Sequence, residues 1–568
     1  MILLNPKKYD REHADEKTKQ LMLKTIEFFE NKGLAKIKED DQERVWYDDF
    51  LEFIKKEEAF ATLLTPSGYG DPDSRWDMWR IEEFNEILGF YGLCYWYTWQ
   101  VTILGLGPIW MGENEEVKHK TAQMLKDGGI FAFGLSEKEH GADIYGTDLM
   151  LYPQEDGTYK ANGDKYYIGN GNEAALVSVF GKVADTGEYV FFVVDTQHPN
   201  YECVKKIDTS GVRQAYVAEF ALHDYPITDA DILSKGPHAW DSALNTVNVG
   251  KYELGWASIG ICEHSLYEAM DHAANRSLYK MYVTDFPHVK KLFTEAYARL
   301  LAMKLFALRA CDYFRSAGPD DRRYLLYNPI QKMKVTMEGE VVIGLLHEIT
   351  AAKGFEQDTY FEMAIRDIGM LPKLEGTTHV NMALVVKFLQ NFMFNHKDYP
   401  EVPRRNDPAN DEFLFNQGPT KGLSKIQFED YNKAFDGLDI ENLKIFREQI
   451  KAFTEFLTKA TPDETQQGNI DYMLKVGELF TLIPYSQLIC ENKKIYGIED
   501  EIMEEIFKFI VSDFSAYATR LYTGQKNTEK QQDLILKMIK KPVHDDDTFM
   551  KVWENHVYAL KGQYKMNE

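Results

Sequence analysis

Hydrophobic residues recur at helical spacing over the first 130 residues of the chain. Helices are predicted over residues 22–32, 50–64 and 76–99. Gly33 is placed to end the first of them, because glycine readily adopts the left-handed conformation that follows many helix ends. Residues 1–130 are therefore predicted to form a helical domain.

One stretch of this domain allows two interpretations. Leu88–Gly112 contains no charged residue and is long enough to cross a bilayer. However, Trp and Tyr residues lie in its middle rather than at its ends, and the run of residues 105–108, Gly-Leu-Gly-Pro, is expected to break it. A buried helix followed by a tight loop is favoured over a membrane span, and no transmembrane segment is expected.

The spacing changes to that of strands after residue 130. Strands are predicted over 131–135, 149–152, 159–161, 165–168, 176–180, 189–194 and 219–222. Asp156-Gly157, Asn162-Gly163 and the turn at 185–187 separate several of them and are typical of hairpins. This pattern predicts a small antiparallel, barrel-like β domain over residues 131–235.

Helical spacing returns in the second half of the chain. A helical bundle is predicted over 236–398, and Gly318-Pro319 ends its long helix from Val289. A proline-rich linker follows, and a C-terminal helical extension is predicted over 410–568. The predicted fold class is therefore α+β and mainly α.

Composition and charge narrow the possible functions. The 568 residues are 44% hydrophobic and 27% charged, which is ordinary for a globular protein with a large core. A net charge of −25 opposes non-specific binding to nucleic acid, so no nucleic-acid partner is expected. The five cysteines are scattered and form no C-x-x-C motif, which predicts reduced thiols, a cytoplasmic location and no metal site.

The heptapeptide Leu374–Val380 is the first candidate for chemistry. Glu375 precedes a helix predicted to start at Thr377 or Thr378, where free N–H groups and the helix dipole favour negative charge. Gly376 would let the backbone approach a planar ligand closely. Alone this pattern decides little, because most glutamates near helix starts are solvated and do no chemistry.

Four spaced segments change this assessment. They are Phe133-Gly-Leu-Ser-Glu-Lys-Glu-His-Gly-Ala-Asp143, Lys165-Tyr-Tyr-Ile-Gly-Asn-Gly171, Arg276-Ser-Leu-Tyr-Lys280, and a closing set of Gly354-Phe355, Arg366-Asp367 and Glu375-Gly376-Thr377. In this order and spacing they resemble the motifs of the acyl-CoA dehydrogenase flavoproteins. The extension after residue 410 is similar to that of the longer family members.

The resemblance implies a reaction and a set of site residues. It implies oxidation of an acyl-CoA to the 2-enoyl-CoA in fatty acid metabolism, with Glu375 as the base for the α-proton and flavin N5 as the hydride acceptor. A carboxylate in a dry cavity is a competent base, and only a cofactor can accept a hydride. The implied FAD-binding residues are Phe133, Leu135, Ser136, Ala142, Tyr167, Gly169, Arg276, Thr377 and His379, and the implied substrate-binding residues are Asn248, Lys251 and Gly376.

The resemblance also implies partners. These are the acyl-CoA substrate, an electron-transfer flavoprotein or a similar acceptor, and a second copy of the chain in a homodimer. Arg276 would meet the FAD diphosphate of the neighbouring subunit.

Several positions depart from the family pattern. Ala142 and Gly169 replace a serine and a threonine, so two side-chain hydroxyls to FAD are missing. Asn248 and Lys251 replace an Asp…Arg pair that holds the substrate. Gly250, where a subclass keeps its base, carries no carboxylate, so the implied base stays at Glu375.

Two other functions stay open on the sequence. An acyl-CoA oxidase would perform the same oxidation and pass the electrons to oxygen. A non-catalytic flavin-binding protein on the same fold would not need Glu375, so the presence of this residue favours catalysis.

Overall fold

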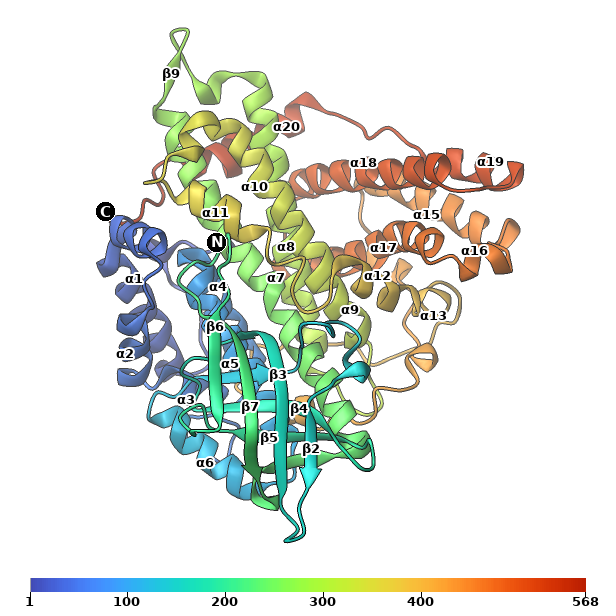
Figure 1. The fold of residues 1–568 in the computed structure, drawn as a ribbon. Coiled ribbons are helices and arrows are strands. Elements are labelled where there is room, and N and C mark those ends of the chain that lie inside the picture. The colour runs from blue at the N-terminus through green and yellow to red at the C-terminus, as the bar shows by residue number, and fades with distance from the viewer. Residues whose placement is uncertain (1) are drawn as a thin grey trace. The chain divides into compact units, whose positions relative to one another are not determined.

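The computed structural model describes residues 2–568, which divide into two compact units (Figure 1). Unit 1 consists of the residues up to Lys8, Ile261–Arg405 and Gly422–Lys565. Unit 2 consists of Tyr9–Gly260, Asn406–Lys421 and Met566–Glu568. This division follows packing rather than chain order, so the four domains predicted from the sequence stay predictions.

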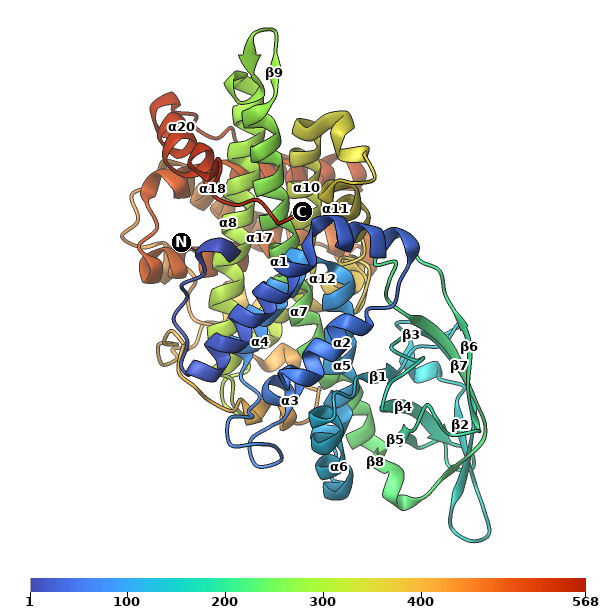
Figure 2. The same cartoon turned by 90° about the vertical axis from the view of Figure 1, so that its left-hand side faces the viewer.

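Unit 2 begins with helices that pack side by side (Figure 2). They are α1 (Glu16–Glu43), α2 (Asp48–Lys56), α3 (Ala59–Leu64), α4 (Met78–Tyr91), α5 (Leu93–Met111) and α6 (Glu115–Lys126). Gly33 interrupts the helical path of α1 with a φ of 76°, but a second helical stretch follows directly. The predicted end of the first helix is therefore a kink.

The uncharged stretch is divided at a different place from the one predicted. The break falls at Gly92, between α4 and α5, and α5 continues through Gly105 and Pro108 to its end. Close packing explains the glycine at 105, because a Cβ there would lie 2.7 Å from the backbone nitrogen of Ala132. Every residue of α5 is buried. Among the helices described, none is long and apolar enough to cross a membrane.

An eight-stranded sheet completes most of unit 2. Its strands are β1 (Phe131–Gly134), β2 (Met150–Pro153), β3 (Tyr159–Gly169), β4 (Leu176–Val183), β5 (Tyr189–Val194), β6 (Tyr201–Lys206), β7 (Val217–Ile227) and β8 (Ile232–Lys235). Their order is β6-β7-β3-β2-β4-β5-β8, with β1 beside β4. Most pairs are antiparallel, as predicted, but β1 and β2 both run parallel to β4.

Two differences from the predicted strands have local causes. The segments 159–161 and 165–168 are one strand, because Asn162-Gly163 is an irregularity in the pairing of β3 with β7 and not a hairpin turn. Gly163 has a φ of 136°, and a Cβ there would lie 2.9 Å from Cα of Leu149, so glycine is required. The sequence pattern missed β6 and β8, the two ends of the strand order; β6 is largely exposed and charged, and β8 is short.

Unit 1 is helical. Helix α7 (Gly236–Asn275) enters it after Gly260, and a short hairpin of β9 (Ser277–Leu278) and β10 (Met281–Tyr282) follows. The bundle helices are α8 (Pro287–Arg315), α9 (Tyr324–Ile330), α10 (Thr336–Thr350), α11 (Tyr360–Ile368), α12 (Thr378–Val386) and α13 (Leu389–Phe394). The C-terminal helices are α14 (Asn432–Phe435), α15 (Glu441–Lys459), α16 (Glu464–Gly468), α17 (Ile470–Tyr496), α18 (Asp500–Gly524), α19 (Glu529–Met538) and α20 (Asp546–Val552). The predicted fold class, α+β and mainly α, is confirmed.

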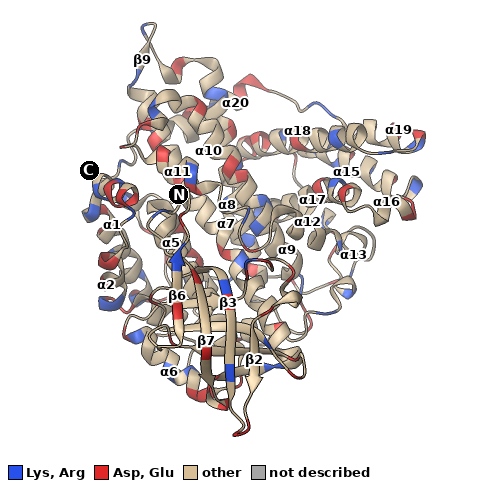
Figure 3. Ribbon diagram, viewed as in Figure 1, with Lys and Arg blue, Asp and Glu red and all other residues tan. Residues whose placement is uncertain are grey.

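The C-terminal helices are fixed to the bundle within unit 1. Helix α17 packs on α8 and α12, and acidic and basic residues interleave along α18 (Figure 3). Arg299 of α8 pairs with Glu338 of α10 at 2.8 Å and with Asp513 of α18 at 3.0 Å. Burial favours the neutral acid, but Lys334 and Arg299 hold the pKa of Glu338 at about 2. This buried charge network ties the extension to the bundle.

Candidate active site

Glu375 lies directly before α12, in a conformation that is uncommon for a residue with a side chain. Its φ is 53°, and that of Gly376 is 82°. Thr377, one of the two residues at which the sequence allowed the helix to start, caps it by accepting a hydrogen bond from the Val380 N–H at 3.4 Å. The left-handed backbone therefore sets Glu375 at the positive end of α12, where the glutamate is half-buried.

A buried lysine and an asparagine fix this loop. Lys332 donates hydrogen bonds to the carbonyl oxygens of Gly376 and Pro372, the latter at 2.7 Å, and the Asn381 amide donates to the same Gly376 oxygen at 2.9 Å. Lys332 lies in a π-helical turn, Gln331–Val335, a distortion that is frequent at functional sites. The sequence analysis missed Lys332, and its only signal there is a lysine in a mainly apolar segment.

The ends of β1 and β3 bring together several of the predicted FAD-binding residues in unit 2. The Ser136 hydroxyl donates to the Tyr166 carbonyl at 2.7 Å, and the Tyr166 N–H donates to the Ser136 carbonyl at 3.0 Å. Next to this pair, Tyr167 has a φ of 64° and is 63% exposed. Phe133 is buried on β1, and Ala142 is exposed on the loop that follows.

A buried ion pair anchors that loop. The Lys165 ammonium lies 2.7 Å from Glu137, and it also donates to the Leu135 carbonyl at 3.0 Å. Glu137 further accepts from the Thr147 hydroxyl and from the Asp148 N–H at 2.8 Å. Burial favours the neutral acid, but the Lys165 ammonium and these donors hold the pKa of Glu137 below its usual value.

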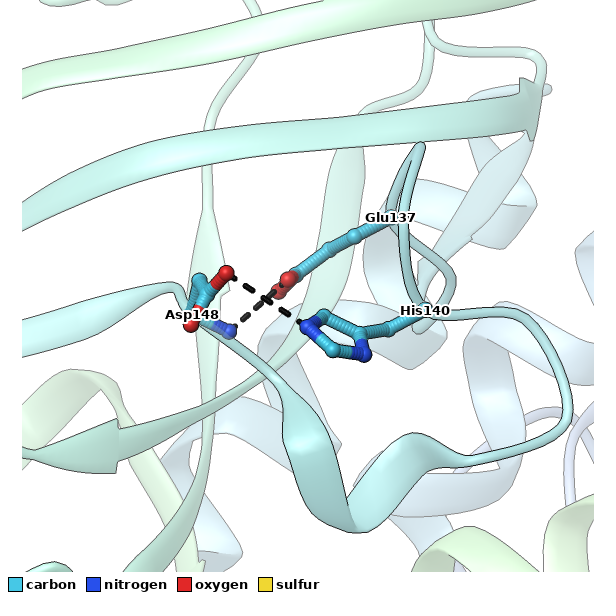
Figure 4. Close-up of side chains that lie close together, drawn as sticks. All are labelled: Glu137, His140 and Asp148. Carbon is cyan, nitrogen blue, oxygen red and sulfur yellow. Dashed lines mark hydrogen bonds and ion pairs between the residues drawn. The ribbon is translucent and has the colours of Figure 1, made fainter.

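Three side chains at this anchor have the spacing of metal ligands. The ligand atoms of Glu137, His140 and Asp148 lie within 4.8 Å of one another, and Figure 4 shows them facing one another. However, the Lys165 ammonium contacts the Glu137 carboxylate, and His140 pairs with Asp143 at 3.0 Å. A cation would have to compete with both, so we interpret the trio as part of the anchor of the loop.

The predicted substrate-binding residues Asn248 and Lys251 are both buried on α7 within unit 2. The Asn248 amide donates to Gln417 at 3.2 Å, and Gln100 of α5 donates to the Gly250 carbonyl at 2.9 Å. Gln417 belongs to Asn406–Lys421, the part of unit 2 that follows the proline-rich linker. The sequence missed Gln417, because this contact joins positions that are far apart in the chain.

The predicted site residues of unit 1 fall into two places. Glu375, Gly376, Thr377 and His379 lie together at the start of α12, with Thr377 and His379 exposed. Arg276 is exposed at the end of α7, beside β9, which lies apart from α12 in both Figure 1 and Figure 2.

Two further carboxylic acids are buried within unit 2, away from any predicted role. Glu253 of α7 and Glu82 of α4 both lie beside the amide of Asn85, whose oxygen accepts from Trp96 at 2.7 Å and from Trp99 at 3.1 Å. Burial raises the pKa of both carboxyl groups well above the ordinary value, and the neighbouring Glu253 charge raises that of Glu82 further. Both are therefore neutral in the folded protein over a pH range in which an exposed glutamate is ionised.

The raised pKa values of Glu82 and Glu253 predict that the free energy of unfolding falls as the pH rises. A carboxyl with a raised folded-state pKa contributes its full stability below the ordinary pKa of glutamate, and it loses about 1.4 kcal/mol per pH unit above that value. Glu253→Gln should therefore unfold at a higher temperature than the wild type at pH 8 and at nearly the same temperature at pH 4. Glu155→Gln, which changes an exposed glutamate, is the control, and equal shifts for both variants would contradict the assignment.

Comparisons with known proteins agree with this architecture. Residues 132–225 match the family profile "Acyl-CoA dehydrogenase, middle domain", and residues 239–390 match "Acyl-CoA dehydrogenase, C-terminal domain". The acyl-CoA dehydrogenase of Bacillus subtilis is 24% identical over 295 residues, which are 51% of this chain and 76% of the relative. The short-chain specific acyl-CoA dehydrogenase of Megasphaera elsdenii is 23% identical over 282 residues, 48% of this chain and 72% of the relative.

A solved structure extends the fold match to nearly the whole chain. An acyl-CoA dehydrogenase from Bacillus anthracis aligns with a TM-score of 0.76 at 16% identity, covering 98% of this chain and 97% of that one. The fold is therefore the helical–β–helical fold of this class, including the C-terminal helices. The chain belongs to the acyl-CoA dehydrogenase family.

Proposed function

We propose that the chain is an FAD-dependent acyl-CoA dehydrogenase that removes hydrogen from Cα and Cβ of an acyl-CoA thioester. The observation that carries this proposal is the conformation of Glu375, a carboxylate in left-handed backbone that Lys332 and Asn381 hold at the start of α12. Such a conformation costs about 1–3 kcal/mol and is concentrated at functional sites. The names of the related dehydrogenases support the reaction class.

FAD is the proposed cofactor. The Bacillus anthracis relative is described as complexed with FAD. In this chain, the exposed ring of Tyr167 suits a large planar group at the end of β3. Leu135 and Ser136 are held beside Tyr167 by hydrogen bonds. The residues proposed to hold FAD are Phe133, Leu135, Ser136, Ala142, Tyr167, Gly169, Arg276, Thr377 and His379.

The proposed chemistry divides between the cofactor and this chain. When bound, FAD supplies the two-electron acceptor that no side chain provides. Glu375 takes the proton from Cα, and its backbone N–H polarises the thioester carbonyl together with Gly376, whose φ lets the backbone come close to the ligand. Lys332 keeps this loop from relaxing, because it ties the Gly376 carbonyl to the bundle.

Asn248 and Lys251 are proposed to position the substrate from α7. Both side chains are buried, and Asn248 is already bonded to Gln417. Contact with the substrate would therefore involve Gln417 as well.

A homodimer is proposed from the exposed hairpin of unit 1. Apolar side chains that are 38–91% exposed follow one another here, and they are Leu278, Tyr279, Met281 and Tyr282. Such clusters mark protein interfaces. The adjacent Arg276 would reach the FAD diphosphate of the partner. Light scattering that gives the mass of a single chain at micromolar concentration would contradict the dimer.

The remaining partners follow from the reaction class and the charge. The electron acceptor is proposed to be an electron-transfer flavoprotein or a similar protein, as expected for a dehydrogenase. A nucleic-acid partner is not proposed, because the net charge is −25. The five cysteines are free, which supports the proposal of a reducing, cytoplasmic compartment.

The proposed function is tested by flavin colour. The purified protein, supplied with FAD, should be yellow and should bleach without oxygen when mixed with one member of a panel of acyl-CoAs of different chain lengths. Rapid return of the colour and hydrogen peroxide formation on admitting oxygen would identify an oxidase instead. Protein that stays colourless after addition of FAD, or yellow protein that bleaches with none of the acyl-CoAs, would contradict the proposal.

A further inference from the structure

A tyrosine of α5 fills the space where the side chain of residue 169 would lie. Gly169 ends β3, at a position where the family motif has a threonine. A Cβ built on Gly169 would lie 2.8 Å from Cε1 and 2.9 Å from the hydroxyl oxygen of Tyr97, and 2.6 Å from Cγ2 of Val101. Real Cβ atoms do not approach other atoms so closely, so a side chain at 169 would require Tyr97 and Val101 to shift.

The contact is held in place by hydrogen bonds between α5 and the sheet. Thr98, the neighbour of Tyr97, donates to the side-chain oxygen of Asn170 at 2.9 Å. The Asn170 amide donates to the carbonyls of Thr98 at 3.2 Å and of Phe131 at 3.0 Å. Thr98 and Asn170 are fully buried. These buried hydrogen bonds fix the backbone of α5 and of the end of β3 on either side of the Tyr97–Gly169 contact.

The hydroxyl of Tyr97 could replace the hydroxyl that a threonine at 169 would carry. A threonine at 169 would present a hydroxyl one bond from its Cβ, and the Tyr97 hydroxyl lies 2.9 Å from that Cβ position. Both groups donate one hydrogen bond and accept others. We infer that Tyr97 supplies to FAD, from α5, the hydroxyl contact that Gly169 lacks on β3. This inference rests on the proposed FAD site, and it makes Tyr97 a cofactor-binding residue.

The inference explains why the glycine at 169 does not abolish the flavin site. The hydroxyl is supplied by helix α5 instead of strand β3, and the glycine at 169 leaves room for the side chain of Tyr97. Positions 97 and 169 are therefore coupled. A phenol also brings an aromatic ring edge next to the end of β3, where Tyr167 of the same strand is exposed.

FAD release from the intact protein tests the inference. Tyr97→Phe keeps the ring and removes only the hydroxyl, so FAD should bind about two- to tenfold more weakly, as loss of one hydrogen bond predicts, and the visible flavin spectrum should shift. The measurements are flavin fluorescence on dilution and the absorbance spectrum, neither of which needs turnover. Tyr95→Phe is the control, because this phenol packs against Phe29 and Phe50 elsewhere on α5.

Further variants test whether the effects of residues 97 and 169 on FAD affinity depend on one another. Tyr97→Ala with Val101→Ala opens the space, and addition of Gly169→Thr to that pair should restore FAD affinity. Gly169→Thr alone should weaken FAD binding, because the threonine meets Tyr97.

The outcomes separate the inference from the proposed function. Wild-type protein that binds no FAD would overturn both. Wild-type protein that binds FAD, with Tyr97→Phe equal to it in affinity and spectrum, would overturn the inference alone.

Discussion

Glu375→Gln is expected to slow anaerobic flavin reduction by the best acyl-CoA by about two to four orders of magnitude, roughly 3–5 kcal/mol of barrier. Glutamine has nearly the same shape and keeps the backbone N–H, so the left-handed loop, the flavin colour and substrate binding should persist. It cannot accept the α-proton. The measurement is stopped-flow bleaching of the flavin in the absence of oxygen.

The structure supplies a matched control for this experiment. Glu253 is the carboxylate closest in sequence to Gly250, but it is fully buried and accepts a hydrogen bond from Asn85. Glu253→Gln should therefore bleach at the wild-type rate. If Glu375→Gln bleaches as fast as the wild type, Glu375 is not the base, and a loss confined to Glu253→Gln would move that role to α7.

Lys165→Met is expected to lower the free energy of unfolding by about 3–5 kcal/mol. The substitution leaves the buried Glu137 carboxylate without its cation, while Thr147 and the Asp148 N–H remain as its donors. The same lysine donates to the Leu135 carbonyl, so the loop proposed to contact FAD should loosen and release FAD more readily. Denaturant unfolding and flavin release on dilution measure the two effects.

Two further variants test whether the destabilisation by Lys165→Met comes from the lost ion pair with Glu137. Lys160 lies on the same strand with an exposed side chain, and Lys160→Met should change the unfolding free energy by less than about 0.5 kcal/mol. In the double variant Glu137→Gln, Lys165→Met, the unpaired charge is absent, and part of the stability should return. Equal stability of Lys165→Met and Lys160→Met would show that the ion pair contributes little.

The sequence predicted helices and strands correctly where residue type and spacing within the segment determine its conformation. The start of α12 at Thr377 or Thr378 and the strand β5 follow from residue type and spacing. The predictions failed where a distant segment decides the backbone. Asn162-Gly163 has the sequence of a hairpin turn, yet the pairing of β3 with β7 makes it part of a continuous strand.

The residues of the candidate active site also differ in whether the sequence could predict them. The motif pattern led to Glu375 and to the residues proposed to bind FAD, because the members of each motif are adjacent in sequence. Lys332 and Gln417 were not predicted, because each acts through a hydrogen bond to a residue in another part of the chain. Neither has a neighbouring motif that would distinguish it from an ordinary polar side chain.

By itself, the sequence determined that a region of strands lies between helical regions, where the family motifs lie and that Glu375 precedes a helix. Spacing of apolar residues and capping are local properties, and they survive in any packing. Only the tertiary structure decided that Glu375 is held in a left-handed conformation by Lys332 and that Tyr97 occupies the space beside Gly169. Close packing and buried hydrogen bonds join residues that are far apart in the chain, so no local pattern encodes them.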